Sequence, residues 1–395
     1  MRRWLAVATI AISCCVRGGY AGWRPFVPLR QARYGAGAVV VGDSLLVIGG
    51  EATWHHHRTR RLSTVEVLDG LTGTWRYGEP LPEPRAFFGL GTIGDTIFVF
   101  GGIDSAGQMS DDVFVFYPDS GEWIHVGDMP FPLSHFSTVR LGNSFFLFGG
   151  WLESVGNFNP YIFVFDPSTN TWDSIVIPAW VPRIDMAAAA IGDTAFLFGG
   201  IYFGQLNWVT KFFNSTVMDF DTLPMAISGM AITHMDGIIY LISGNSGGNE
   251  QSVGWYFVPS SQQWGELPDL ISSRSYATAA VFENNLFVIG GRRCDWTMRS
   301  VEVLELQSIE EEGSGRQLSK FKVFAPNPLT YESRITIVAP HEAELSVYSA
   351  NGSLVLRRRL HEGVNSLVWK PIGLPSGVYF YKIGDEGGRW LYLRR

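Results

Sequence analysis

Six copies of one short pattern run along the first 300 or so residues of the chain. Each copy has two apolar runs around a two-residue turn, as in GAVVVGDSLLVIGG at 37–50. The copies begin at residues 37, 89, 137, 187, 231 and 278, a spacing of 44 to 52 residues. A repeat of this length is a supersecondary unit that cannot bury its apolar face alone and must pack on its neighbours. The pattern therefore predicts an all-β repeat fold built from hairpins.

Each unit continues beyond its hairpin in a similar way. A glycine pair closes five of the six hairpins, where the backbone bends and approaches its neighbours too closely for a Cβ. A third apolar strand follows, and then in most units a tryptophan suited to fill the wedge between neighbouring units. The glycines are Gly49, Gly50, Gly101, Gly102, Gly149, Gly150, Gly199, Gly200, Gly290 and Gly291, and the tryptophans are Trp75, Trp123, Trp172 and Trp264.

The sixth unit stops at Gln307 without a tryptophan, and the missing piece lies at the other end of the chain. Trp23 precedes Arg33 by ten residues, the same spacing that separates Trp75 from Arg85. We therefore expect the segment Trp23 to Arg33 to supply the fourth strand of the sixth unit by pairing with Val301 to Leu306. Such a pairing removes both free edges of an otherwise open ring.

Double glycine and spaced tryptophan, repeated in this way, resemble the kelch family of β-propellers. The resemblance covers residues 22–307 and implies a six-bladed kelch β-propeller closed by the N-terminal strand. A β-sandwich with accidental glycines is the alternative, and the repeats argue against it.

The first 21 residues have the features of a secretory signal peptide. Arg2 and Arg3 precede an apolar stretch, Trp4 to Val16, and a small-residue cleavage site follows before Gly22. Acylation of Cys14 in a lipoprotein signal is a weaker alternative. Removal of this segment leaves Cys294 as the single cysteine, so the mature chain is expected to form no internal disulfide. No other apolar run is long enough to cross a membrane as a helix.

The charge balance changes sign near the C-terminus. After a polar linker at 308–319, residues 316–395 carry 12 Lys or Arg and 6 Asp or Glu, whereas the rest of the chain carries 18 and 31. Alternating apolar runs in 320–395 predict about seven strands and hence a small Ig-like β-sandwich.

Several motifs of this tail resemble the C-terminal sorting domain of the type IX secretion system of Bacteroidota-type bacteria. They are Ala325-Pro326-Asn327-Pro328, Leu345-Ser346-Val347-Tyr348 before Asn351-Gly352, Leu374-Pro375-Ser376-Gly377-Val378-Tyr379, and Arg394-Arg395. The resemblance implies the type IX secretion machinery as a partner and a secreted or outer cell-surface location, reached through Sec and the periplasm. A plain adhesive Ig-like module is the alternative.

Loops that follow the glycine pairs, and those that enter each first strand, share one face in kelch propellers. Exposed aromatic and arginine side chains there suit stacking on sugar rings or contact with carboxylates. The candidate ligand-binding residues are Trp54, Arg85, Trp151, Tyr202, Trp208, Arg292, Arg293 and Trp296. They favour a non-catalytic module that binds a glycan or a peptide.

A sugar-active enzyme on the same scaffold, such as a sialic-acid mutarotase-like epimerase, is the alternative, with Glu51, Arg85, Asp104 and Arg292 as residues that could converge. No motif of a copper radical oxidase is found. Three adjacent histidines, His55 to His57, point in alternating directions in extended chain and lie beside arginines, so no metal site is expected there. We expect no cofactor, and a net charge of −7 argues against nucleic-acid binding.

Overall fold

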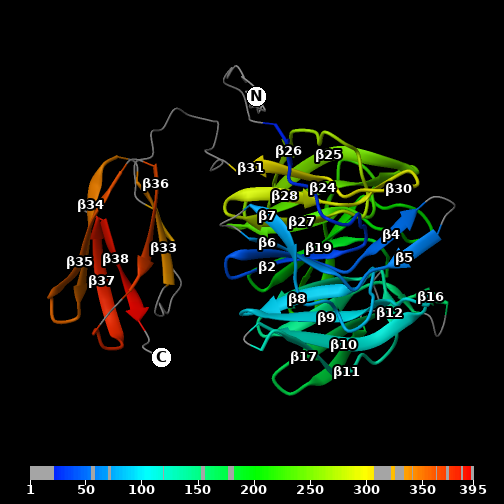
Figure 1. Cartoon of the computed structure of the whole chain (residues 1–395), viewed down its shortest axis with the longest axis horizontal. Helices are drawn as coiled ribbons and strands as arrows, with labels where there is room; N and C mark the ends of the chain where they lie inside the picture. Colours follow the sequence, from blue (N-terminus) through cyan, green and yellow to red (C-terminus); the bar gives the residue numbers. More distant parts are fainter. Residues whose placement is uncertain are drawn as a thin grey trace, which may run out of the picture. The chain divides into compact units, whose positions relative to one another are not determined.

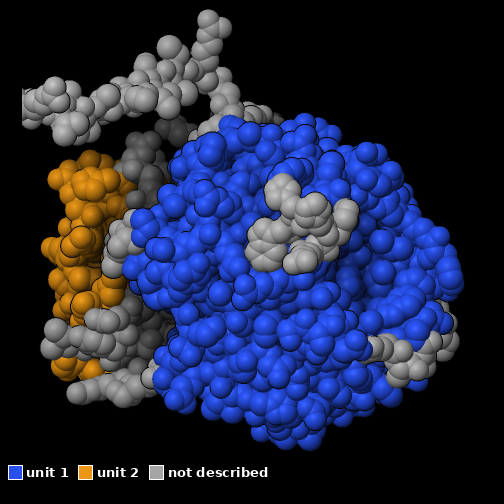
Figure 2. All heavy atoms as spheres, turned by 45° about the vertical axis from the view of Figure 1, so that its right-hand side comes forward, with its two compact units in different colours: residues 1–307 blue, residues 308–395 orange. Residues whose placement is uncertain are grey.

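The computed structural model divides the chain into two compact units, residues 1–307 and 308–395 (Figure 2). It describes residues 22–54, 58–69, 73–118, 120–152, 156–176 and 182–306 of the first unit. In the second unit it describes 322–324, 333–339, 341–361, 363–370, 373–383 and 386–392. The predicted signal peptide, His55 to His57, the linker at 308–319, Ala325 to Pro328 and Arg394-Arg395 lie outside the described residues. Within these ranges no helix is long and apolar enough to cross a membrane.

The first unit is built on six four-stranded antiparallel sheets, with smaller sheets in its loops (Figure 1). Within the first five sheets the chain runs from an inner strand outward, and in the sixth the outer strand is supplied by the N-terminal segment. In chain order, the first two sheets are β2 (Gly37–Val41), β3 (Ser44–Ile48), β6 (Val65–Asp69) and β7 (Thr74–Tyr77), and then β8 (Gly89–Ile93), β9 (Thr96–Ile103), β10 (Met109–Tyr117) and β11 (Glu122–Asp128). The third and fourth are β13 (Ser137–Leu141), β14 (Ser144–Phe148), β17 (Tyr161–Asp166) and β18 (Thr171–Val176), and then β19 (Ala187–Ile191), β20 (Thr194–Phe198), β21 (Trp208–Phe213) and β22 (Thr216–Thr222). The fifth and sixth are β23 (Ala231–Met235), β24 (Ile238–Ser246), β25 (Asn249–Val258) and β26 (Gln263–Leu267), and then β27 (Thr278–Phe282), β28 (Asn285–Ile289), β31 (Val301–Glu305) and β1 (Arg24–Phe26).

The inner strands of successive sheets contact one another in a closed circle. β2 contacts β8, the contacts continue through β13, β19 and β23 to β27, and β27 returns to β2. Each sheet is therefore one blade of a β-propeller, the fold that the repeats predict, and we number the blades I to VI in the order just given.

The N-terminal strand closes the circle as the sequence predicts. In the pairing of β1 with β31, Arg24 lies opposite Val303 and Phe26 opposite Val301. The indole of Trp23 is buried and donates a 2.8 Å hydrogen bond to the carbonyl of Pro268. Blade VI thus has no free outer edge along β31.

The spaced tryptophans lie in the apolar layers between blades. Trp75 is buried among residues of blades I and VI, and its indole donates a 2.8 Å hydrogen bond to the carbonyl of Val27. Trp172 packs on the core between blades II and III, and Trp264 on the core between blades IV and V. These contacts agree with the wedge role expected from the spacing.

The glycine pairs are needed where each second strand ends. Gly49 has a φ of 59°, and a Cβ there would approach the carbonyl oxygen of Arg85 to 2.6 Å. A Cβ on Gly149 would lie 2.1 Å from the carbonyl oxygen of Arg183. The blade V copy lacks the first glycine, and Ser243 takes the left-handed conformation instead, with a φ of 58°.

Buried arginines tie these bends to the third strand of the same blade. Arg33 is 1% exposed and donates to the carbonyls of Gly49 at 2.8 Å and Thr64 at 2.9 Å, while its second terminal nitrogen pairs with Glu66 at 2.7 Å. Arg274 does the same with the Gly290 carbonyl and Glu302. A guanidinium supplies several donors in a fixed plane, which suits the two carbonyls and one carboxylate at each site.

The second unit has two antiparallel sheets with a shared apolar core. The core includes Ile335, Leu345, Leu360, Trp369 and Tyr379. One sheet is β32 (Lys322–Phe324), β33 (Ser333–Ala339) and β36 (Gly363–Trp369), and the other has the order β35 (Leu354–Leu360), β34 (Ala343–Ser349), β37 (Gly377–Ile383) and β38 (Glu386–Tyr392). Two sheets around one core agree with the β-sandwich expected for the tail.

Candidate functional site

Segments that enter the six inner strands join in a closed circle of backbone hydrogen bonds. In each blade, the residue two positions before the inner strand donates its N–H to the carbonyl of the matching residue in the preceding blade, at 2.8 to 3.1 Å. Six such bonds close on themselves. We call the six residues the ring, and they are Gly35, Phe87, His135, Asp185, Gly229 and Tyr276.

All six ring residues have left-handed backbone conformations, with φ between 52° and 60°. Glycine adopts this conformation freely, but bulky residues such as Phe87 and Tyr276 do not. Each such residue adds backbone strain energy on the order of 1 kcal/mol or more. The circle of hydrogen bonds and the fixed start of each inner strand hold them in place. Strained residues of this kind are concentrated at functional sites.

Aromatic side chains of the ring pack on one another. The phenyl group of Phe87 stacks on the imidazole of His135, with their centroids 4.2 Å apart and their planes 16° from parallel. Tyr276 meets the edge of Phe87 at 5.5 Å, and Tyr34, one position before Gly35, meets Phe87 at 5.9 Å. Tyr34, Phe87, His135 and Tyr276 thus form one aromatic cluster with members from blades I, II, III and VI, which we call the aromatic floor.

Two of the glycine positions make room for these rings. A Cβ on Gly35 would lie 2.9 Å from the ring of Phe87, and a Cβ on Gly229 would lie 2.9 Å from the ring of Tyr276. Tyr276 therefore extends over Gly229 of blade V and reaches Asp185 of blade IV, where its hydroxyl donates a 2.9 Å hydrogen bond to the carboxylate. The two glycines set which side chains can meet.

Burial changes the proton affinity of this pair. Desolvation raises the pKa of Asp185 above its ordinary value of 3.8, against the opposing effects of His135, the Tyr276 hydrogen bond and Arg292. Burial, and the nearby Asp185 carboxylate, also raise the pKa of Tyr276. The ring thus holds a carboxyl group that gives up its proton less readily than one in water.

A cation lies beside the aromatic floor. The guanidinium of Arg292 is 5.3 Å from the ring centroid of Tyr276 and 5.7 Å from that of Tyr34. Within the described residues, no carboxylate oxygen lies within 4 Å of its nitrogens. The guanidinium thus packs against two aromatic rings and is not neutralised by a direct ion pair among the described residues, which leaves it able to bind an anionic or strongly polar group.

The loops after the glycine pairs are fixed to the ring segments by short bridges. Ser275, next to Tyr276, exchanges backbone hydrogen bonds with Arg292, and Ser134, next to His135, pairs with Trp151. The same bridge joins Tyr34 to Glu51. These bridges bring the first residue of each post-glycine loop next to the ring. Three of these loops form small sheets of their own: the hairpin of β4 (Glu51–Trp54) with β5 (Arg58–Arg61), the hairpin of β29 (Arg292–Arg293) with β30 (Trp296–Thr297), and the sheet of β12 (Leu133–Ser134), β15 (Trp151–Leu152) and β16 (Asn157–Phe158).

Two of the sequence-predicted residues belong to a second aromatic group. Trp151 meets the edge of Phe158 at 5.4 Å, and Tyr202 lies 5.0 Å from Phe158 and 4.7 Å from Phe203. Phe203 is 87% exposed and has a φ of 52°. This group, Trp151, Phe158, Tyr202 and Phe203, lies on the post-glycine loops of blades III and IV, and we call it the aromatic ledge.

The other predicted residues differ in their surroundings. Trp208, Trp296 and Arg293 are exposed, and Trp296, which is 67% exposed, lies beside the turn of its hairpin. Trp54 is the last residue of β4, and its side chain lies outside what the structure describes. Among those of the eight predicted residues whose side chains the structure describes, Arg292 is the one that contacts a side chain of the ring, that of Tyr276.

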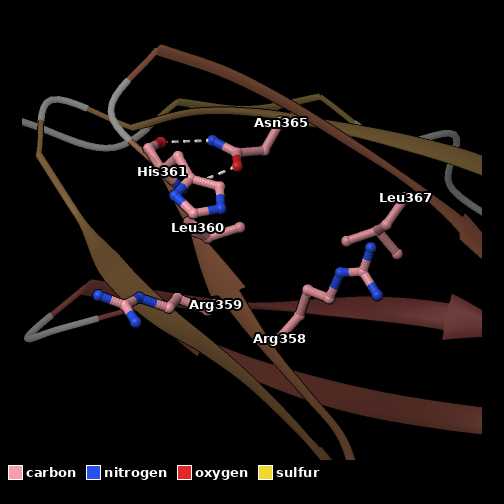
Figure 3. A pocket seen from close by; sticks show the side chains of 6 residues that line it. All are labelled: Arg358, Arg359, Leu360, His361, Asn365 and Leu367. Atoms are coloured by element: carbon pink, nitrogen blue, oxygen red, sulfur yellow. Dashed lines mark hydrogen bonds between the residues drawn. The ribbon is translucent and has the colours of Figure 1, made fainter.

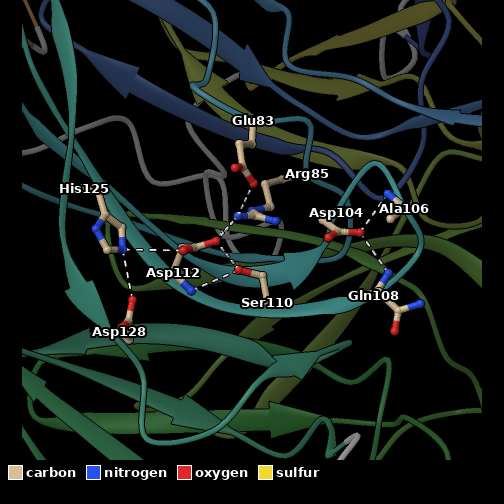
Figure 4. A network of polar contacts seen from close by, with 9 residues as sticks. All are labelled: Glu83, Arg85, Asp104, Ala106, Gln108, Ser110, Asp112, His125 and Asp128. Carbon is tan, nitrogen blue, oxygen red and sulfur yellow. Dashed lines mark hydrogen bonds and ion pairs between the residues drawn. The ribbon is translucent and has the colours of Figure 1, made fainter.

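The expectation for Arg85 is wrong. Its side chain is fully buried and pairs with Asp112 and, at 3.1 Å, with Glu83, so it holds blade II together and does not reach the face (Figure 4). The enzyme alternative named Glu51 and Asp104 as residues that could converge with Arg85, and the described residues show no such contact. Glu51 pairs with Arg61 at 2.9 Å, and Asp104 accepts hydrogen bonds from the backbone of Ala106 and Gln108 in its own loop.

The second unit contains a shallow pocket along the edge strand β35. It is lined by Arg358, Arg359, Leu360, His361, Asn365 and Leu367 (Figure 3). Asn365 exchanges hydrogen bonds with the backbone of His361, at 2.9 and 2.7 Å. The flanking arginines are exposed and paired, Arg357 with Glu344 and Arg359 with Glu342. Charged side chains on an edge strand discourage pairing with another chain.

Comparison with known protein families gives two matches. Residues 35–222 match the KLHDC2/KLHL20/DRC7 Kelch-repeats domain, and residues 322–391 match the Secretion system C-terminal sorting domain. Both agree with the resemblances drawn from the repeats and from the tail.

Curated relatives are distant. Kelch-like protein terF of Aspergillus terreus is 22% identical over 229 residues, which is 52% of this chain and 49% of that protein. Human Kelch-like protein 23 is 23% identical over 257 residues, 63% of this chain and 43% of that protein. Beta-scruin of Limulus polyphemus is 25% identical over 45% of this chain and 20% of its own length. The chain thus spans less than half the length of these relatives.

A solved structure described as "Structure of YjhT" superposes with a TM-score of 0.61 at 15% identity. The match covers 72% of this chain and 98% of that one. At this identity the similarity establishes the propeller fold and nothing about the ligand.

Proposed function

We propose that this chain, which joins a Kelch-repeat propeller to a secretion system sorting domain, is an exported protein that binds a glycan or a peptide at its ring. The Kelch repeats and the sorting domain support a secreted kelch protein. Binding, and the nature of the ligand, are our inference from the chemistry of the ring.

One observation carries the proposal. Arg292 lies against Tyr34 and Tyr276 beside the stacked pair Phe87 and His135, so a cation, two hydroxyls, an imidazole and aromatic faces share one small area. Aromatic faces bind the apolar faces of sugars or the side chains of peptides, and the guanidinium binds a carboxylate or another polar group. The aromatic ledge would extend the same surface toward blades III and IV.

The sorting domain supports export by the type IX secretion machinery, with the mature protein released or attached to the cell surface. Passage through Sec and the periplasm, with cleavage before Gly22, is part of the proposal. Mass spectrometry of the culture medium and of the cell surface tests it, and a full-length product confined to the periplasm would contradict it.

Screening the purified protein on glycan and peptide arrays tests binding directly. We expect a hit whose affinity falls at least about tenfold in R292A, since a charge-assisted hydrogen bond contributes on the order of 1.5–3 kcal/mol. The matched control is R140A, because Arg140 is exposed and bonds to Gly142 at the hairpin turn, at the opposite end of its blade. Equal loss in both variants, or none in R292A, would refute this location.

An enzyme that acts on free sugars is the second candidate, and Asp185 is the observation that favours it. A carboxyl with a raised pKa beside an imidazole and a phenol could transfer protons. NMR measurement of anomer exchange on sialic acid and other free sugars separates the two candidates. Exchange faster than in buffer that is lost in D185N and kept in D95N, a change in an exposed hairpin turn, would favour the enzyme.

A further inference from the structure

Two carboxylates face each other across the outer strands of blade II. Asp112 of β10 and Asp128 of β11 are direct cross-strand partners, so their side chains point to the same side of the sheet. Like charges placed directly opposite one another destabilise a sheet unless a cation lies between them. Arg85 already pairs with Asp112, and a cation placed between the two carboxylates would serve both of them.

A β-bulge adds a histidine to the pair. The register shifts between Val113 and Phe114, so that His125, not Val126, becomes the partner of Phe114. In a regular ladder His125 and Asp128, three residues apart, would point to opposite faces. The extra residue in β11, next to Gly127 with a φ of 142°, turns His125 to the face that carries both carboxylates.

The three side chains bring their ligand atoms together (Figure 4). His125 Nε2 lies 3.0 Å from Asp128 Oδ1 and 3.5 Å from Asp112 Oδ1, and all three atoms lie within 4.8 Å of one another. Tetrahedral zinc with ligands at 2.0 to 2.1 Å needs donor atoms about 3.3 Å apart. The distances from His125 to both carboxylates are close to that spacing.

Neighbouring side chains hold the carboxylate of Asp112 in a fixed orientation. The second oxygen of Asp112 accepts hydrogen bonds from the Ser110 hydroxyl and from the buried Arg85, so its first oxygen remains directed at His125. Outer partners of this kind orient ligating carboxylates in metal sites. The positive charge of Arg85 lowers the affinity for a cation, but Arg85 binds the oxygen that faces away from His125.

We propose that Asp112, His125 and Asp128 form a divalent transition-metal site, with zinc as its simplest occupant. The site fastens β11 to β10 at the outer edge of blade II, and through Asp112 and Arg85 it continues to the segment that enters the same blade. Three protein ligands leave a fourth position, which a water or a group from a partner would fill. This site is separate from the proposed ligand face.

Zinc binding by the metal-free, untagged full-length protein tests the proposal. We would measure stoichiometry and affinity by competition with a chromophoric chelator, in the native protein, H125Q, D128N and S110A. E122Q is the matched control, because Glu122 is an exposed acid on the same strand outside the cluster. A fifth variant, with His55, His56 and His57 changed to alanine, separates zinc held by that histidine run.

We expect H125Q and D128N each to lose one zinc equivalent that E122Q and the triple histidine variant keep. S110A should weaken that equivalent by about 10- to 100-fold, the loss typical of an outer partner. Cobalt(II) bound there should give the absorption spectrum of tetrahedral nitrogen and oxygen ligands. Equal zinc stoichiometry and affinity in native protein and folded H125Q, or no zinc bound by the triple histidine variant, would overturn the proposal.

Discussion

The hydroxyl of Tyr276 donates a hydrogen bond of 2.9 Å to the carboxylate of Asp185, although the two residues belong to blades VI and IV. The side chain of Tyr276 crosses the blade between them, where the ring position is Gly229. The bond thus joins non-adjacent blades, and together with the circle of backbone hydrogen bonds it gives the ring a fixed arrangement of polar groups.

Replacement of Asp185 should change how stability depends on pH. Because the folded pKa of Asp185 is raised above its ordinary 3.8, the folded protein holds this proton more tightly than the unfolded chain. Its contribution to stability is therefore largest below pH 3.8 and is lost as pH rises through the folded pKa. We expect the unfolding free energy of D185N minus that of the native protein to increase with pH across this window.

Urea unfolding at several pH values between 3 and 8 measures this difference. D95N is the control, because Asp95 is exposed in a hairpin turn. A difference for D185N that stays constant, or that decreases with pH, would show that Asp185 is not buried as described.

Alanine at Gly229 should destabilise the protein more than alanine at Gly192. Both glycines have a φ near 60°, so both substitutions carry the same backbone strain of about 1 kcal/mol or more. Only Gly229 has the Tyr276 ring against it, because nothing lies within 4 Å of a Cβ at Gly192. Chemical denaturation gives the two free energies, and the ring proton shifts of Tyr276 should move in G229A alone. Equal losses of unfolding free energy in G229A and G192A would contradict the position of the Tyr276 side chain over Gly229.

The repeats predict much of this fold because their information is periodic. Hairpins, glycine bends and interblade tryptophans each recur several times, and the unpaired tryptophan at Trp23 indicates how the circle closes. The ring was missed as a set, because its members share a backbone position and not a residue type. Extending the repeat alignment two residues toward the N-terminus would have found all six, from Gly35 to Tyr276.

Other errors have a different cause. An arginine such as Arg85 reads the same in sequence whether it meets a ligand or a carboxylate of its own blade such as Asp112, since the pairing depends on where the third strand passes. The cluster around His125 was also missed, because a single inserted residue in a strand changes which side chains share a face.

Loss of one partner in the buried pair Arg274 and Glu302 should be costly. R274M leaves the Glu302 carboxylate buried without its cation, and removing one member of such a pair typically costs about 3–5 kcal/mol. The double variant R274M/E302L should recover part of this loss, because no buried charge remains. Thermal and urea unfolding of the two variants measures both effects, and a double variant weaker than R274M would contradict the explanation.

Deletion of residues 22–32 should open the propeller and lower its stability by several kcal/mol. The deletion removes β1, the buried indole of Trp23 and the backbone N–H groups of Arg30 and Gln31, which bond to Glu66 at 2.6 and 3.0 Å. R24A, a change at an exposed position of the same strand, should leave stability almost unchanged. If the truncated protein has the same melting temperature as the intact protein, the N-terminal strand does not close the circle.

The most direct test of ligand binding at the ring is NMR titration of protein labelled with 13C in its tyrosine and phenylalanine rings. On addition of an array-identified glycan or peptide, we expect the largest shifts at Tyr34, Phe87 and Tyr276, with Tyr117 at the far end of β10 unchanged. Shifts confined to Tyr117 and other residues away from the ring would contradict the proposed function.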